Sequence, residues 1–314
     1  ARILAASGRT DDAFQSFEQA EREFDDLTAR FPNVHQYKID LGKCLESKGL
    51  LTLRTNPKGD GLETILRANA LFAEVLGHDP DNVEYQAMLG ASFVQVGYAR
   101  QAVGDTPAAV ESFRRAGELL KPVVQLRPAE IRHARTLGTS LNNLAELQRR
   151  GAQLEQAAGT FREALELGER LAQRNPQVTG LQDDLASTCM NLSLLHIDLN
   201  DFDAAQPLMT HAVEIREELA RRDSSNLRRQ ETLARTLDNL ANLEADRGQH
   251  PDALQRFERA LNIRKHLATL VPEDTDYQRA AARSALNLGD LQREMKLTDD
   301  AAANIGFARD NLSR

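Results

Sequence analysis

The chain has 314 residues and a formal net charge of -8, and 41% of its residues are hydrophobic although it contains no tryptophan. The negative charge argues against a general nucleic-acid or anionic-membrane binder. A globular fold of this length usually divides into two domains, whereas a solenoid whose units pack only on their neighbours can form one elongated domain. No apolar run of membrane-spanning length is present, so we expect no membrane partner.

In chain order, the sequence predicts pairs of helices that recur at a fixed period. The chain begins within a unit, where Gly8 separates the end of one helix from a helix over residues 10–30. This ragged start predicts a fragment of a longer protein. We expect a single repeat domain over residues 1–314 with units at 1–31, 32–79, 80–127, 128–175, 176–223, 224–271 and 272–314.

Small residues mark the period. One column of positions, spaced by 48 residues, holds Ala13, Gly61, Ala109, Ala157, Ala205, Ala253 and Ala301. A second holds Ala20, Ala68, Ala116, Ala164, Ala212, Ala260 and Ala308, and a third holds Pro32, Pro80, Pro128, Pro176, Ser224 and Pro272. A fixed period of this size indicates stacked supersecondary units.

Each unit reads as two helices. Apolar residues recur three and four positions apart over residues 178–199 and 226–247, which predicts helix. The first helix of a unit is expected to end at Gly151, Asn200 or Gly248, because these residue types accept a left-handed backbone. Residues 56–61 form a polar turn in the second unit, and Gly61 replaces the column alanine there. We therefore expect a loosened junction in that unit.

The spacing of small and apolar residues within one unit is typical of a known family. The positions that carry it are Leu141, Leu144, Ala145, Ala157, Phe161 and Ala164. The chain thereby resembles the tetratricopeptide repeats over nearly its whole length. The usual repeat of that family has about 34 residues, so the longer period predicts helices of about 20 residues, or ~30 Å.

Long repeats of this kind resemble those of kinesin light chains and of the arrays that follow the kinase domain in certain bacterial serine/threonine kinases. The resemblance implies an all-α fold, a right-handed superhelical α-solenoid of antiparallel helix pairs. It also implies that the first helix of each unit lines a concave groove.

A polar column runs along the first helices. It holds Asn143, Asn191, Asn239 and Asn287, each one residue before a column leucine, and the two earlier units have Gln95 and Ser47 at the same position. In peptide-binding relatives such an asparagine row holds the backbone of an extended peptide, and a carboxamide suits this role because it offers both a donor and an acceptor. The alternative is that each asparagine joins neighbouring first helices by hydrogen bonds, since half-buried amides are usually satisfied within the protein.

Side chains beside this column would set specificity. They are Asn142, Met190, Asp238 and Leu286 one residue before it, Tyr98, Glu146, Leu194, Asn242 and Asp290 one turn after it, and Arg235 and Arg283 one turn before it. The two arginines are placed to meet a carboxylate of the partner. Positive charge is crowded at one turn between units and on the helix after it, in Arg221, Arg222, Arg228, Arg229 and Arg235. We interpret this as a solvated face balanced by nearby acids. The alternative is a docking site for an acidic peptide or phosphopeptide.

The sequence shows no phosphate-binding loop, paired-histidine zinc motif or cysteine cluster. His196 and His211 flank one turn, but two ligands do not make a zinc site. We therefore predict no metal, no cofactor and no catalytic activity. Cys44 and Cys189 lie about three units apart on apolar positions, and two lone thiols fit a reducing compartment, so we expect a cytoplasmic location.

These observations predict a protein-interaction scaffold that binds an extended or helical peptide segment in its concave groove. Two alternatives remain open. One is a regulatory or substrate-recruiting region of a larger bacterial serine/threonine kinase. The other is a structural module that self-associates through its exposed end units.

Overall fold

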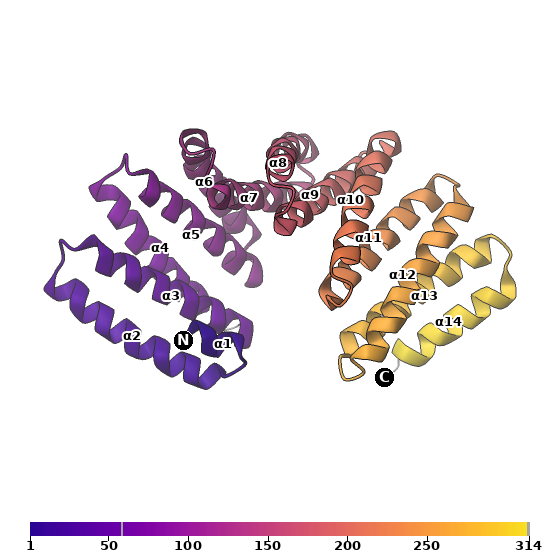
Figure 1. Ribbon diagram of the computed structural model, residues 1–314, viewed down its shortest axis with the longest axis horizontal. Coiled ribbons are helices and arrows are strands. Elements are labelled where there is room, and N and C mark those ends of the chain that lie inside the picture. The colour runs from indigo at the N-terminus through magenta and orange to yellow at the C-terminus, as the bar shows by residue number, and fades with distance from the viewer. Residues whose placement is uncertain (58, 313–314) are drawn as a thin grey trace. The chain divides into compact units, whose positions relative to one another are not determined.

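The computed structural model describes residues 1–57 and 59–312, and in this part the chain is all-helical (Figure 1). Lys58, in the polar turn of the second unit, lies outside the described residues. The helices are α1 (Arg2–Ala6), α2 (Thr10–Arg30), α3 (His35–Thr55), α4 (Gly61–His78), α5 (Val83–Ala102), α6 (Thr106–Leu126), α7 (Ile131–Arg150), α8 (Leu154–Arg174), α9 (Thr179–Asp198), α10 (Phe202–Arg222), α11 (Leu227–Asp246), α12 (His250–Leu270), α13 (Thr275–Glu294) and α14 (Thr298–Leu312). The predicted all-α fold of consecutive helix pairs is confirmed.

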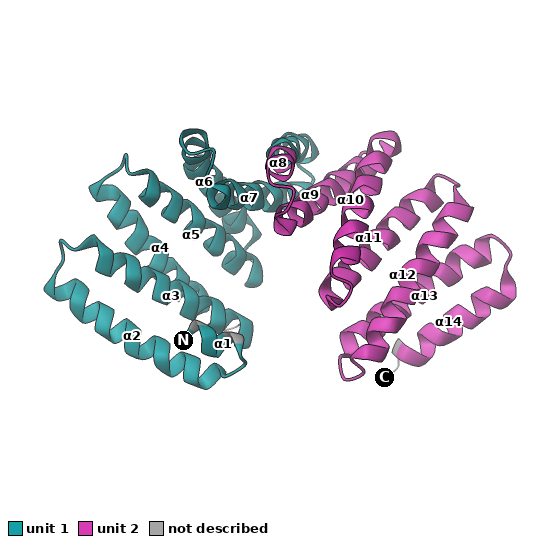
Figure 2. Ribbon diagram, in the orientation of Figure 1, with its two compact units in different colours: residues 1–167 teal, residues 168–314 magenta. Residues whose placement is uncertain are grey.

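The chain divides into two compact units, residues 1–167 and residues 168–314 (Figure 2). In unit 1, α3 pairs with α4 and α5 pairs with α6; in unit 2, α9 pairs with α10, α11 with α12, and α13 with α14. The paired helices run from 18 residues in α4 to 21 in α6, apart from the shorter α14, as the long period predicted. The right-handed superhelix and the single domain stay predictions.

Alanine and phenylalanine build the core between paired helices. The column alanines Ala109, Ala157, Ala205 and Ala253 are all completely buried, which lets the helix backbones approach closely. A bulky apolar residue from each second helix fills the space between the helices, as with Phe113, Phe161, Met209 and Phe257. Burying one such side chain stabilises the fold by about 1.5–3 kcal/mol.

The turns inside the pairs use a left-handed residue at one repeated position. Asn200 and Gly248 have φ angles of 57° and 73°, as predicted. The prediction for Gly151 was wrong by one residue: Gly151 has a φ of -82° as the C-cap of α7, and Ala152 takes the left-handed conformation with a φ of 57°. Gln153 N–H then bonds the Gln148 carbonyl at 2.9 Å, which closes the helix end.

The junction between α3 and α4 is close and not loosened, contrary to the expectation for the second unit. Gly61 is buried, and a Cβ atom built on it would lie 2.7 Å from the Gly49 carbonyl oxygen. A Cβ on Gly49 would lie 2.6 Å from an Ile65 side-chain carbon. Glycine therefore replaces the column alanine because the two helices approach more closely here than an alanine permits.

Candidate functional site

Two carboxamides of the asparagine column are available for a ligand in unit 2. Asn239 of α11 and Asn287 of α13 are half-buried, and neither side chain has a hydrogen-bond partner among residues 1–57 and 59–312. The two helices are neighbours, because the Ser284 hydroxyl of α13 donates to Asp238 Oδ2 of α11 at 3.0 Å. Adjacent helices thus present equivalent amides, each with a donor and an acceptor to spare.

The same two helices also present unopposed positive charge. Arg235 and Arg283 lie one turn before Asn239 and Asn287, both are exposed, and within the described part of the chain neither forms an ion pair. Asn242, one turn after Asn239, is exposed as well, whereas Asp290 accepts from Arg293 at 3.0 Å. Two arginines and two amides therefore form a repeated set on α11 and α13, which we call the Arg–Asn face.

The asparagine column behaves differently in unit 1. The Asn143 amide of α7 donates to the Tyr98 hydroxyl of α5 at 3.1 Å and to the Thr139 carbonyl at 2.8 Å. The bond to Tyr98 joins two first helices. This is the alternative role considered for the column, in which its amides join neighbouring helices and do not bind a ligand. Gln95 of the column and Asn142 beside it are half-buried in unit 1, and Asn191 of the column is half-buried in unit 2.

Glu146 was expected beside the column to contact a ligand, but its carboxylate pairs with two arginines of its own helix. Its carboxylate accepts from Arg149 at 2.8 Å and from Arg150 at 2.6 Å. Burial alone would raise the pKa of Glu146, but the hydrogen bonds and charges of the two arginines outweigh burial and lower that pKa. The carboxylate therefore anchors the basic end of α7.

Asp238 was expected among the specificity residues, but it is buried. It forms an ion pair with Arg264 of α12, which also binds the Ser284 hydroxyl and contacts Glu231 at 3.1 Å. Burial raises the pKa of Asp238, while the Arg264 guanidinium opposes that change. Asp238 therefore joins α11, α12 and α13 to one another and is not exposed to a ligand.

Sequence reasoning missed the buried arginines of the second helices. Arg216 and Arg264 are spaced by one period, as are their hydroxyl partners Thr236 and Ser284, so the signal was present. Arg216 also donates to Ser187 at 3.0 Å, but its closest carboxylate oxygen, on Asp183, is 3.9 Å away. Burial lowers the pKa of Arg216 to about 10, although Asp183 opposes this effect.

Three of the four arginines at the turn between α10 and α11 have acidic partners, whereas Arg228 is exposed and has no ion pair within the described residues. Arg221 and Arg222 pair with Glu218 at 2.6 and 2.8 Å, and Arg229 pairs with Asp223 at 3.4 Å. This supports the interpretation of a solvated, balanced face at the turn itself.

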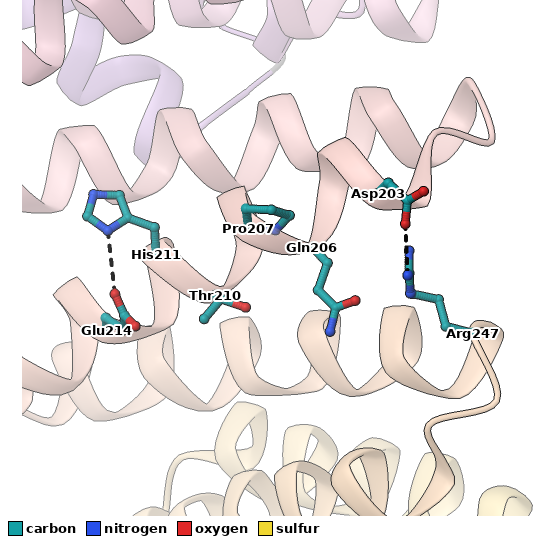
Figure 3. Close-up of a pocket in the computed structure, with 7 residues that line it drawn as sticks. All are labelled: Asp203, Gln206, Pro207, Thr210, His211, Glu214 and Arg247. Atoms are coloured by element: carbon teal, nitrogen blue, oxygen red, sulfur yellow. Dashed lines mark ion pairs between the residues drawn. The ribbon is translucent and has the colours of Figure 1, made fainter.

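A hollow of about 420 Å³ lies along α10, with Arg247 contributed by the turn after α11 (Figure 3). Its ionisable groups are engaged: Arg247 pairs with Asp203 at 2.8 Å, and His211 lies 3.6 Å from Glu214. His196 instead contacts Asp201 at 3.1 Å. Across the described residues, no group of three or more histidine, cysteine or acidic side chains is arranged to hold a metal ion.

Both cysteines are buried free thiols. Burial, with the charge of Glu169 in addition, raises the pKa of Cys189 to about 12, which leaves almost no reactive thiolate at neutral pH. In the part of the chain that the structure describes, none of the helices combines the length and the apolar character needed to cross a bilayer.

Comparisons with known proteins agree with this repeat architecture. Residues 184–266 match the family model described as tetratricopeptide repeat. The crystal structure of BtubC (BKLC) from P. vanneervenii is similar with a TM-score of 0.61 and 21% identity, over 80% of this chain and 89% of that one. The apo form of RapI is similar with a TM-score of 0.50 and 15% identity, over 87% and 98% of the two chains. No curated protein sequence matches the chain significantly.

Proposed function

We propose that this chain, which matches the tetratricopeptide repeat model over residues 184–266 and folds as consecutive helix pairs, is a protein-interaction scaffold whose Arg–Asn face binds an extended, acidic peptide segment. The observation that carries the proposal is the repeated set of unpartnered groups, Arg235 with Asn239 and Arg283 with Asn287, on neighbouring helices of unit 2. In this mechanism the amides hold the peptide backbone and the guanidinium groups bind carboxylates.

The geometry of the helices specifies a spacing for the ligand. Packed helices lie about 8–10 Å apart. A peptide in the extended polyproline II conformation advances about 3.1 Å per residue with three residues per turn, so side chains three residues apart lie on the same face. Two carboxylates that meet Arg235 and Arg283 should therefore be about three residues apart in the peptide. Each amide contact is worth about 0.5–1.5 kcal/mol, and each exposed charge pair at most about 1 kcal/mol, so we expect moderate affinity.

The test uses fluorescein-labelled peptides of ten residues in fluorescence anisotropy. One peptide carries two aspartates three residues apart, a second carries them adjacent, and a third carries asparagines in their place. Wild-type chain should bind the first peptide most tightly. The double variant Arg235→Gln with Arg283→Gln should bind that peptide roughly tenfold more weakly, which corresponds to ~1.4 kcal/mol. Its affinity for the asparagine peptide should equal that of the wild type.

The amide variant and a control complete the test. The double variant Asn239→Ala with Asn287→Ala should bind all three peptides more weakly, because contacts to the peptide backbone do not depend on the side chains of the peptide. Arg174→Gln removes an equally exposed arginine from a second helix and should change nothing. Equal affinity of wild type and both double variants for the spaced aspartate peptide would refute the Arg–Asn face as a binding site.

A further inference from the structure

A separate cavity of about 390 Å³ lies in unit 1 among α3, α5 and α7, with a floor from α4. We call it the unit-1 cavity. Its volume falls within the roughly 300–1,000 Å³ of sites that bind small molecules, which are typically apolar with a few placed polar groups. The cavity lies one to two turns before the amide column: Met88 and Ser92, which line it, precede Gln95 by seven and three residues along α5.

The walls of the unit-1 cavity are mixed, with apolar side chains from α3, α4 and α5 beside polar side chains from α3, α5 and α7. Ile39, Phe72, Tyr85 and Met88 are the larger apolar side chains among them. Phe72 is 2% exposed, and Gly42 makes room for its ring, since a Cβ on Gly42 would lie 2.5 Å from Phe72 Cε1. The floor is therefore held in place by close packing and is preformed for an apolar group.

The rim of the cavity carries one unopposed charge. Arg132 of α7 is exposed, and no ion-pair partner for it is found among the described residues. The acid nearby is engaged, because Glu84 accepts from Arg127 at 2.8 Å and lies 3.9 Å from the buried His133 ring. Lys43 and Glu46, one of each charge, also line the cavity and add no net charge.

We propose that the unit-1 cavity binds a small amphiphilic carboxylate. The apolar body of the ligand packs on Ile39, Phe72 and Met88, and its carboxylate pairs with the Arg132 guanidinium, which can accept it in a bidentate geometry. The apolar side chains among the walls favour a bulky body, and the Arg132 charge favours an anion over an alcohol of the same shape. This site is independent of the Arg–Asn face, which belongs to unit 2.

The experiment titrates the full chain with 3-phenylpropionate by calorimetry and ligand-observed NMR. The neutral analogue 3-phenylpropan-1-ol and the small anion acetate separate the contributions of charge and apolar body. We expect saturable binding of 3-phenylpropionate, at least tenfold weaker binding of the alcohol, and no detectable binding of acetate. Arg132→Gln should lower the affinity for 3-phenylpropionate by about tenfold and leave the affinity for the alcohol unchanged.

Two further variants make the result decisive. Ala91→Leu places a larger side chain into the cavity and should abolish binding of both aromatic probes, with circular dichroism to confirm the fold. Arg174→Gln removes an exposed arginine that belongs to neither proposed site and should leave 3-phenylpropionate binding at the wild-type level. The proposal is overturned by the absence of saturable binding below about 10 mM, a free energy of roughly -3 kcal/mol, or by Arg132→Gln binding as tightly as wild type.

Discussion

At the scale of single residues, two buried arginines at equivalent positions have opposite surroundings. Arg264 is neutralised by Asp238 and Glu231, whereas the nearest carboxylate of Arg216 is 3.9 Å away and Met190 stands where the next repeat has Asp238. The Arg216 Nε atom is buried without a hydrogen-bond partner. A buried charge without a close counter-ion contributes little net stability, while removing one member of a buried pair leaves the other uncompensated.

We therefore predict different costs for the same substitution at the two sites. Arg264→Met should destabilise the chain by about 3–5 kcal/mol, because it leaves Asp238 buried without its counter-ion. Arg216→Met should cost less than about 1.5 kcal/mol, since no buried carboxylate depends on it. Urea unfolding followed by circular dichroism measures both. Adding Asp238→Leu to Arg264→Met should recover most of the loss, and equal losses for the two single variants would contradict this account.

For the candidate site, the sequence predicted which residues recur but not what each side chain contacts. The column of amides was visible as a period, but the state of each amide depends on the neighbouring helix. Asn143 meets the Tyr98 hydroxyl, while the residue equivalent to Tyr98 for Asn239 is Leu194, which has no hydrogen-bonding group. The burial of Asp238 was hidden for the same reason, because its partner Arg264 comes from a different helix.

At the scale of helices, the sequence predicted pairs and their length because hydrophobic spacing and column positions are local signals. The prediction for the junction of α3 and α4 was wrong, because it considered only the low helix propensity of the glycine at the column position. In the structure, a Cβ atom on Gly49 or on Gly61 would lie within 2.7 Å of an atom of the opposite helix. Whether a glycine loosens or permits packing depends on the neighbouring helix, which propensity does not describe.

Two glycines of α4 provide a matched test. Gly61→Ala should destabilise the chain by about 1–3 kcal/mol, because the new Cβ would press on the Gly49 carbonyl and force the helices apart. Gly77→Ala in the same helix meets nothing within 4 Å and should stabilise by about 0.5 kcal/mol. Thermal unfolding of the two variants beside wild type measures both changes in stability. A stabilising Gly61→Ala would show that the junction is loose after all.

At the scale of the molecule, each helix of a unit contacts helices one or two positions along the chain. Stability in such arrays is approximately a sum of repeat terms and nearest-neighbour interfaces, and three or more repeats are needed for a stable fold. Unit 2 contains three complete pairs, α9 with α10, α11 with α12, and α13 with α14. It therefore meets that requirement by itself.

We predict that a fragment of residues 152–314, which keeps the whole of α8, folds alone. It should show a helical circular dichroism spectrum and a cooperative thermal transition, because the interfaces it retains are local. It should also bind the spaced aspartate peptide as the full chain does. A disordered or aggregated fragment would mean that the interfaces of residues 1–151 are needed to stabilise unit 2.

The left-handed turn has a consequence for how such a chain can change length. The conformation recurs at Gly104, Ala152, Asn200, Gly248 and Lys296, each one period from the next, although five positions hold four residue types. The backbone geometry is thus kept while the side chain varies. An in-frame genetic deletion or duplication of one whole period between two of these turns would rejoin identical backbone conformations, whereas any other length would place a helix where a turn belongs. Arrays of this kind can gain or lose repeats by recombination without designing a new junction.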